Sequence, residues 1–430
     1  MILRASSSLA KTIRRRSRDL AWTLFGKFAM TGANSALMLF LGWFMNIEAY
    51  GLFATAVGVQ LLVSRMVMLG VDQGMIRLYT VEDLRDRPER VVQAGLRSMG
   101  LLSIPVVLLG GAALLVGVQD WPWFSLAAVI MGSVGLAMFD YAVCTRLARL
   151  RYRRAALVQA SMPAVRLILT VGAFWIAPER PAAVFLVYAA SVLLFGLTLS
   201  LRTAQQAAGR TEDRPDRKLL FRLISYSKWP GLCDVAMMAC LQQGLFLLSY
   251  LDREADRGVY GFALTLSMGF FAIFLAYYQT ILPRAARLDR IEELPPFVLK
   301  CVLAALLLVF GCVILTVLIG MFLPGFMEYK PELRGFAAPF YGLAAFMMLL
   351  IMEAPLTVAC QYLLLPQLAL VGMTVRIGLV AYFGFRLAPQ YGAAGAGAAQ
   401  AAGAATSLLL YAALVALAVR RRIRSEPCAG

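Results

Sequence analysis

Long apolar runs, separated by short polar or charged connections, follow one another along the whole chain. A helix needs about 20 apolar residues to cross the hydrocarbon of a bilayer, so each run predicts one transmembrane helix. The pattern predicts an all-α polytopic membrane protein with twelve transmembrane helices. The connection at 358–366 is so apolar that the tenth and eleventh spans could form one segment. We expect the spans at residues 20–44, 52–75, 99–118, 122–144, 156–177, 182–201, 229–250, 258–282, 299–323, 336–358, 363–385 and 391–419.

The composition agrees with a membrane protein. Of 430 residues, 61% are hydrophobic and 15% are charged, whereas soluble domains carry about 25% charged residues. The net charge of +17 would suit a nucleic-acid partner if the cations lined a wet face beside a soluble core. Because the cations lie between the apolar runs instead, we expect no nucleic-acid partner.

The distribution of positive charge predicts the orientation. Most of the 41 Lys and Arg residues fall in a basic arm at 1–19, in the even-numbered connections and in the tail at 420–430. By the positive-inside rule these segments face the cytoplasm, which places both termini there. Trp121 and Trp123, on either side of Pro122, would then anchor the chain at the outer interface.

The two halves of the chain share a spacing. The sequence YGLFA at 50–54, after the first span, returns as YGFA at 260–263, after the seventh, an offset of 210 residues. The same offset relates the Val-Arg pair ending at Arg166 to the one ending at Arg376. With six spans each, both halves have the same orientation and would be related by a pseudo-twofold axis along the membrane normal, leaving a cleft between them for a substrate. We expect one six-helix bundle at 20–201, a cytoplasmic linker at 202–228 and a second bundle at 229–419.

Three local features resemble the polysaccharide flippases of the Wzx type. They are the short turn into residues 50–53, the Arg-rich connection after the second span, and YGAAGA at 391–396, which opens the last span. These flippases belong to the MOP exporter superfamily, together with MATE drug exporters and the lipid II flippase MurJ. The resemblance covers nearly the whole chain in length, span count and arrangement of halves. MurJ-like proteins have two additional spans that this pattern lacks, and the acidic ion sites of MATE-like proteins find no match position by position.

The resemblance implies a transporter of the bacterial inner membrane. It would carry undecaprenyl-pyrophosphate-linked oligosaccharides, the precursors of surface polysaccharide, from the cytoplasmic to the periplasmic leaflet by alternating access. Membrane lipids would surround it. A polysaccharide polymerase and glycosyltransferases of the same pathway would be its partners.

Four cations fall inside the predicted spans: Lys27, Arg65, Arg166 and Arg376. A charge at the centre of a transmembrane helix costs about 2.5–3.5 kcal/mol, so each requires a partner or a function. Arginine stays protonated, and its planar set of donors suits phosphate oxygens. We expect these cations to line the substrate path and bind a diphosphate or acidic sugars. The alternative is that they pair with buried acids or helix carbonyls and hold the bundles together.

Polar side chains on the first and seventh helices would extend this path. Asn34 shares one face of its helix with Lys27, while Gln242 and Gln243 offer amides that either bind sugar hydroxyls or join helices. The offset of 210 residues places Asp234 one turn from Lys27 across the cleft. The two would form an ion pair that opens and closes with the halves, or a static polar pair.

Two further acids stand inside spans. Glu353 precedes Pro355, and a carboxyl in hydrocarbon takes up a proton more readily than in water, so Glu353 would couple transport to protons. The alternative is a hydrogen bond at the helix kink. Asp140 lies near the cytoplasmic end of the fourth span, where it is either part of a gate or an interfacial residue beside Arg146.

Two other functions compete with a flippase. A MATE-like ion-coupled exporter of small molecules would present an acidic cleft, whereas the charge in the spans is mainly positive. A membrane enzyme such as a polymerase would need a long outer loop with catalytic groups, and the outer connections are short. The chain has no histidine, which excludes catalytic triads and metal sites that depend on histidine. Its seven cysteines form no CxxC pair. We expect no enzymatic activity, no metal and no cofactor.

Overall fold

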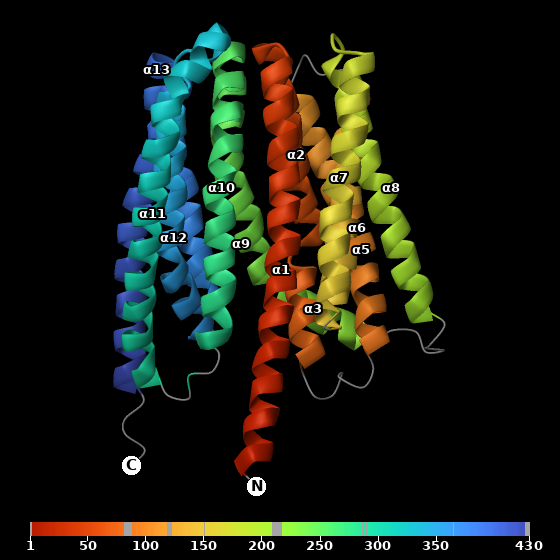
Figure 1. Cartoon of the computed structure of the whole chain (residues 1–430), viewed down its shortest axis with the longest axis vertical. Coiled ribbons are helices and arrows are strands. Elements are labelled where there is room, and N and C mark those ends of the chain that lie inside the picture. Colours follow the sequence, from red (N-terminus) through yellow and green to blue (C-terminus); the bar gives the residue numbers. More distant parts are fainter. Residues whose placement is uncertain are drawn as a thin grey trace. The chain divides into compact units, whose positions relative to one another are not determined.

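Long helices make up almost the whole computed structural model, which describes residues 2–80, 88–117, 123–149, 151–208, 217–285, 288, 291–363 and 365–425 (Figure 1). These residues contain no β-strand, which confirms the predicted all-α class. Two short 3-10 turns, Ile291–Glu293 and Pro331–Leu333, flank α11. The helices are α1 (Ile2–Phe44), α2 (Ile47–Met68), α3 (Val71–Thr80), α5 (Pro88–Gly117), α6 (Trp123–Ala148), α7 (Tyr152–Ile176), α8 (Pro181–Ala208), α9 (Arg217–Tyr250), α10 (Glu254–Ala285), α11 (Leu294–Tyr329), α12 (Ala337–Tyr362) and α13 (Pro366–Ser425).

The predicted spans lie on these helices, with two departures. The second span is broken, because Leu69 and Gly70 take positive φ angles of 35° and 71° between α2 and α3. The basic arm continues into the first span as α1. Ten stretches of the described residues are long and apolar enough to cross a membrane. The predicted anchor residues Trp121 and Pro122 lie outside the described residues.

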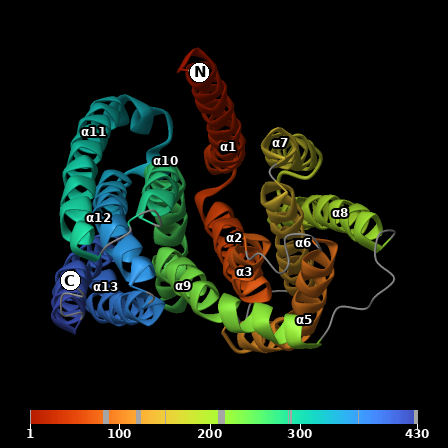
Figure 2. The same ribbon diagram turned by 90° about the horizontal axis from the view of Figure 1, so that it is seen from below.

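The chain forms two compact units. Unit 1 comprises Met1–Leu37 and Gly70–Ser227, and unit 2 comprises Met38–Leu69 and Lys228–Gly430. In unit 1, α8 packs along α6 and α7, and α3 packs against α5 and α6. In unit 2, α12 packs against α10, α11 and α13, as Figure 2 shows from below. The second helix, α2, which the sequence assigns to the first half, packs along α10 in unit 2.

The helix α13 turns back on itself at Gly392, which takes a φ of 56° and a ψ of −132°. This break separates the predicted eleventh and twelfth spans. The two segments pack antiparallel with a small residue at every level, which is how transmembrane helices reach close approach. The contacts step by four residues along one segment and back by four along the other, joining Gly372 to Tyr411, Arg376 to Ser407, Val380 to Gly403, Gly384 to Ala399 and Ala388 to Gly395.

A charged cluster fixes the turn of this hairpin. The Asp256 carboxylate accepts the backbone N–H of Ala393 at 3.2 Å and pairs with Arg253 at 3.1 Å. A Cβ on Gly392 would lie 2.3 Å from that carboxylate, and its φ is positive, so only glycine fits both constraints. The first glycine of the YGAAGA motif, Gly392, is therefore required by the turn of the hairpin.

The repeated sequence motif has a repeated local structure. Thr55 donates to the carbonyl of Gly51 at 2.8 Å, and Thr265 donates to the carbonyl of Gly261 at 2.9 Å, each four residues back. The Tyr50 hydroxyl also lies 3.0 Å from the Thr265 hydroxyl, which ties α2 to α10. The same four-residue bond recurs on other helices, as at Thr145, Thr203 and Thr374, so the internal duplication stays a prediction.

The end of α1 is held by a lysine from far along the chain. The ammonium of Lys330, in the connection after α11, donates to the carbonyls of Gly42, Trp43 and Met45 at 2.8–2.9 Å. These carbonyls have no partner within the helix, and a cation is favourable at a helix C-terminus. Burial lowers the pKa of Lys330, and nearby Glu332 acts in the opposite direction.

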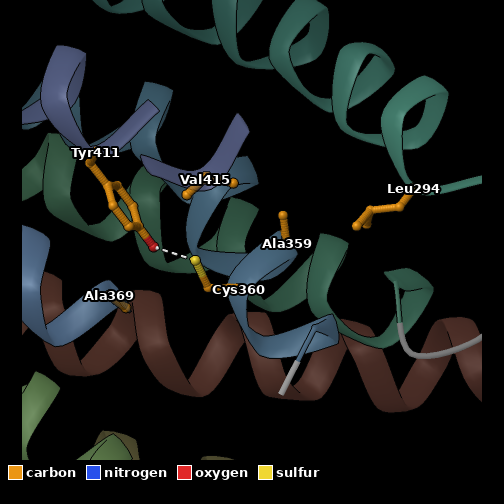
Figure 3. Close-up of a cluster of buried hydrophobic side chains, with 6 residues drawn as sticks. All are labelled: Leu294, Ala359, Cys360, Ala369, Tyr411 and Val415. Carbon is orange, nitrogen blue, oxygen red and sulfur yellow. Dashed lines mark hydrogen bonds between the residues drawn. The ribbon is translucent and has the colours of Figure 1, made fainter. Parts of the chain in front are cut away.

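Buried side chains join the ends of α12 and α13. Tyr411 is 1% exposed, and its hydroxyl lies 3.2 Å from the thiol of Cys360 (Figure 3). The remaining members of this cluster are apolar: Leu294, Ala359, Ala369 and Val415. Cys360 is thus a buried free thiol.

We predict that Gly403→Ala lowers the stability of the protein by about 1–3 kcal/mol, because overpacking a close contact forces neighbouring atoms to move. A Cβ there would lie 2.4 Å from Val380 Cγ2. Gly378→Ala, on the same hairpin, has nothing within 4 Å of its new Cβ. It should be neutral or stabilise by up to about 1 kcal/mol. Thermal unfolding of both variants in detergent checks this, and equal effects would contradict the register of the hairpin.

Candidate functional site

Two buried arginines stand 210 residues apart, at the offset of the predicted repeat. Arg166 on α7 is 3% exposed, and Arg376 on the first segment of α13 is 1% exposed. Arg166 belongs to unit 1 and Arg376 to unit 2. Their partners differ, and this difference determines what each can do chemically.

Arg166 carries a charge without a carboxylate partner among the described residues. Its Nη2 donates to Oδ1 of Asn34 on α1, and its guanidinium carbon lies 4.4 Å from the ring centroid of Tyr188 on α8. Its Nε is buried and has no hydrogen-bond partner within the described chain. An amide oxygen and an aromatic face stabilise a cation, but neither neutralises it. The site therefore holds net positive charge with an N–H donor still available.

Two more polar residues lie on the same side of α7. Thr170, one turn beyond Arg166, is fully buried, and its hydroxyl lacks a hydrogen-bond partner among the described residues. Gln159, about two turns before Arg166, packs against α1, where a Cβ on Gly26 would lie 2.5 Å from its Oε1. The recurrence of Gln159, Arg166 and Thr170 at helical spacing could have been found in the sequence. No comparable signal pointed to Tyr188.

Arg376 is neutralised within its unit. Its Nη2 forms an ion pair with Glu353 of α12, whose side chain is 4% exposed, and its Nε donates to Ser407 at 2.9 Å. Gln243 of α9 donates to the carbonyl of Ile377, next to Arg376, at 3.0 Å. This is the arrangement expected if Arg376 and Glu353 hold the bundle together. One donor group, Nη1, is buried without a partner in the described chain.

The remaining candidate residues are dispersed. Gln242 is buried against α2, where a Cβ on Gly58 would lie 2.6 Å from its Oε1. The other four, Lys27, Arg65, Asp140 and Asp234, are half-buried, and each takes part in an interaction. The predicted pairing of Lys27 with Asp234 stays a prediction. Within the described residues, no group of His, Cys, Asp and Glu could hold a metal ion.

Comparison with known proteins identifies the fold. No family model and no curated protein matches the sequence. Among solved structures, an inward-facing multidrug resistance MATE family transporter of the MOP superfamily is 12% identical, with a TM-score of 0.66 over 93% of this chain and 96% of that one. The lipid II flippase MurJ, in an inward closed conformation, is 9% identical, with a TM-score of 0.62 over 92% of this chain and 86% of that one.

A third solved structure with a similar fold is described by the polarity of its own binding pocket. A MOP superfamily transporter from Pyrococcus furiosus, described as having a binding pocket of reverse polarity that suggests a different function, is 14% identical, with a TM-score of 0.59 over 95% of each chain. The chain is thus a multi-pass membrane protein with the fold of MOP superfamily transporters. Identities this low show the fold and leave the substrate open.

We predict that breaking the Arg376–Glu353 ion pair lowers the stability of the protein, whereas removing the charge of Arg166 does not. Glu353→Gln should destabilise by about 3–5 kcal/mol, because removing one partner leaves a buried charge uncompensated. Adding Arg376→Met to that variant should restore most of the loss. Arg166→Met removes a cation that no carboxylate neutralises and should be neutral or stabilising. Thermal unfolding in detergent measures all three, and a large loss for Arg166→Met would show that Arg166 has a structural role.

Proposed function

We propose that this protein moves an anionic, phosphate-bearing lipid-linked oligosaccharide from the cytoplasmic to the periplasmic leaflet of the inner membrane by alternating access. The observation that carries the proposal is the uncompensated charge of Arg166, which is 3% exposed. A cation in such a place is costly unless an anion neutralises it for part of the cycle. A substrate that supplies this anion would explain the site.

The geometry suits phosphate oxygens. Arg166 offers its unpartnered Nε, and Thr170 on the same helix face offers a hydroxyl. Tyr188 lies against the guanidinium at 4.4 Å and Asn34 accepts from one nitrogen, so the group is already oriented before a substrate arrives. Guanidinium donors bind phosphate in two parallel hydrogen bonds, and the Asn34 oxygen is the contact that a phosphate oxygen would replace. A diphosphate head group would bind here while its lipid tail stays in the bilayer.

In unit 2, Arg376 is already paired with Glu353. The proposal thus assigns anion binding to unit 1, and it assigns Arg376 and Glu353 to the integrity of unit 2. The energy source stays open.

The alternative is an ion-coupled exporter of small molecules, as in the MATE family. Two observations favour it: MATE transporters are among the structural neighbours, and unit 2 holds a buried acid in Glu353. Such a protein would move small organic cations, and its activity would depend on Glu353 rather than on Arg166. The two functions therefore differ both in substrate and in the residue that carries the transport.

We predict that Arg166→Gln slows lipid flipping about 10- to 100-fold, because each hydrogen bond to a charged group contributes about 1.5–3 kcal/mol. Arg166→Lys keeps the charge but loses the planar donors and should restore part of the rate. The control is Arg180→Gln, an exposed residue between α7 and α8. The rate is measured in proteoliposomes that contain a fluorescent diphosphate-linked disaccharide lipid. A membrane-impermeant quencher is added outside, and fluorescence falls as lipid from the inner leaflet reaches the outer one.

The same vesicles separate the alternatives. A parallel assay measures efflux of a small organic cation from proteoliposomes with an imposed proton or sodium gradient. Normal flipping by Arg166→Gln at normal protein levels would remove Arg166 from the mechanism. Cation efflux by the wild type without lipid flipping, and kept by Arg166→Gln, would establish the exporter instead.

A further inference from the structure

The first three turns of α9 carry a basic face that the transport proposal does not use. Arg217, Lys218 and Arg222 line a surface cavity of about 610 Å³ together with Phe221, Ser225 and Tyr226. None of the six lining residues is acidic, and the acids just before them in the sequence, Glu212, Asp213 and Asp216, lie outside the described residues. All the lining residues belong to unit 1. The cavity is therefore cationic, with aromatic rings set between the charges.

The opposite face of the same turns is fixed to unit 1. Leu219, Leu223 and Ser227 recur at four-residue steps and are at most 9% exposed. Leu223 and Ser227 contact α3, where a Cβ on Gly74 would lie 3.0 Å from Leu223 and 2.1 Å from the Ser227 hydroxyl. Because these residues are buried, the basic side chains of the same turns are exposed.

The start of the predicted seventh span places this face at the membrane surface. That span, residues 229–250, rises about 33 Å at 1.5 Å per residue and so crosses hydrocarbon about 30 Å thick without the turns before it. The basic turns belong to the predicted cytoplasmic linker at 202–228, and Pro230 lies in the helix just after them. Phe221 is 77% exposed. A bare aromatic ring between cations is typical of helices that rest in the interfacial layer of a bilayer.

We propose that this face, Arg217 to Tyr226 on α9, is a binding site for the headgroups of anionic phospholipids of the cytoplasmic leaflet. The three cations attract the phosphates, the Ser225 hydroxyl is placed to donate to a phosphate oxygen, and Phe221 enters the acyl-chain boundary. The guanidinium of Arg222 lies 5.9 Å from the centroid of the Tyr226 ring, which limits its motion. The site rests on the predicted cytoplasmic orientation of α9 and does not depend on which substrate is carried.

We predict that the full chain in a mild detergent binds phosphatidylglycerol more tightly than phosphatidylcholine with the same acyl chains, as measured by native mass spectrometry. The triple variant Arg217→Gln, Lys218→Gln, Arg222→Gln should lose this preference. Each cation near a lipid surface contributes about fivefold to the binding constant, or on the order of 100-fold for three. Phe221→Ser should weaken binding of both lipids several-fold without changing the unfolding temperature.

The matched control is Arg420→Gln with Arg421→Gln, two exposed cations at the end of α13. The control should keep the preference for phosphatidylglycerol. The proposal fails if the triple variant keeps it, or if the control loses it to the same extent. It also fails if inorganic pyrophosphate displaces the lipid completely, which would indicate a site for free phosphate. Loss of flipping by the triple variant with lipid binding intact would assign the face to the substrate instead.

Discussion

A charge inside hydrocarbon must be neutralised or used, and this constraint explains more of the protein than any other. It explains why two arginines at the offset of the predicted repeat, 210 residues apart, have different partners. Arg376 has a carboxylate from α12 and a hydroxyl from its own hairpin, so its charge is balanced inside unit 2. Arg166 has an amide and a ring, so its charge stays open. The two arginines therefore differ in their neighbours: one has a carboxylate partner, and the other has none among the described residues.

The sequence predicted the helices well because hydrophobic length is a direct consequence of the bilayer. The Gly/Ala run of the last span allows close packing, as the four-residue register of α13 shows. The break between α2 and α3 was not predicted. It depends on the left-handed backbone of Leu69 and Gly70, and a leucine in that conformation leaves no trace in a hydrophobicity pattern.

The site was predicted only in part, for a physical reason. Periodicity shows which residues share a helix face, so Arg166 and Asn34 could be selected as polar residues within spans. It does not show which helix packs beside which, so the pairing of Arg376 with Glu353 and the stacking of Arg166 on Tyr188 required coordinates. The sequence left open whether the central arginines bind a substrate or hold the bundles together, and the contacts of these two support a different answer for each.

The lysine that closes the first helix also constrains how the protein is made. The carbonyls at the end of α1 receive their cation from Lys330, which follows them by 285–288 residues. During synthesis α1 is inserted long before that residue leaves the ribosome. Its last turn must meanwhile rely on water or lipid headgroups at the surface. Capping of the C-terminal end of α1 by Lys330 is therefore a late event of biogenesis. Chains truncated before residue 330 would leave this end of α1 without its cation.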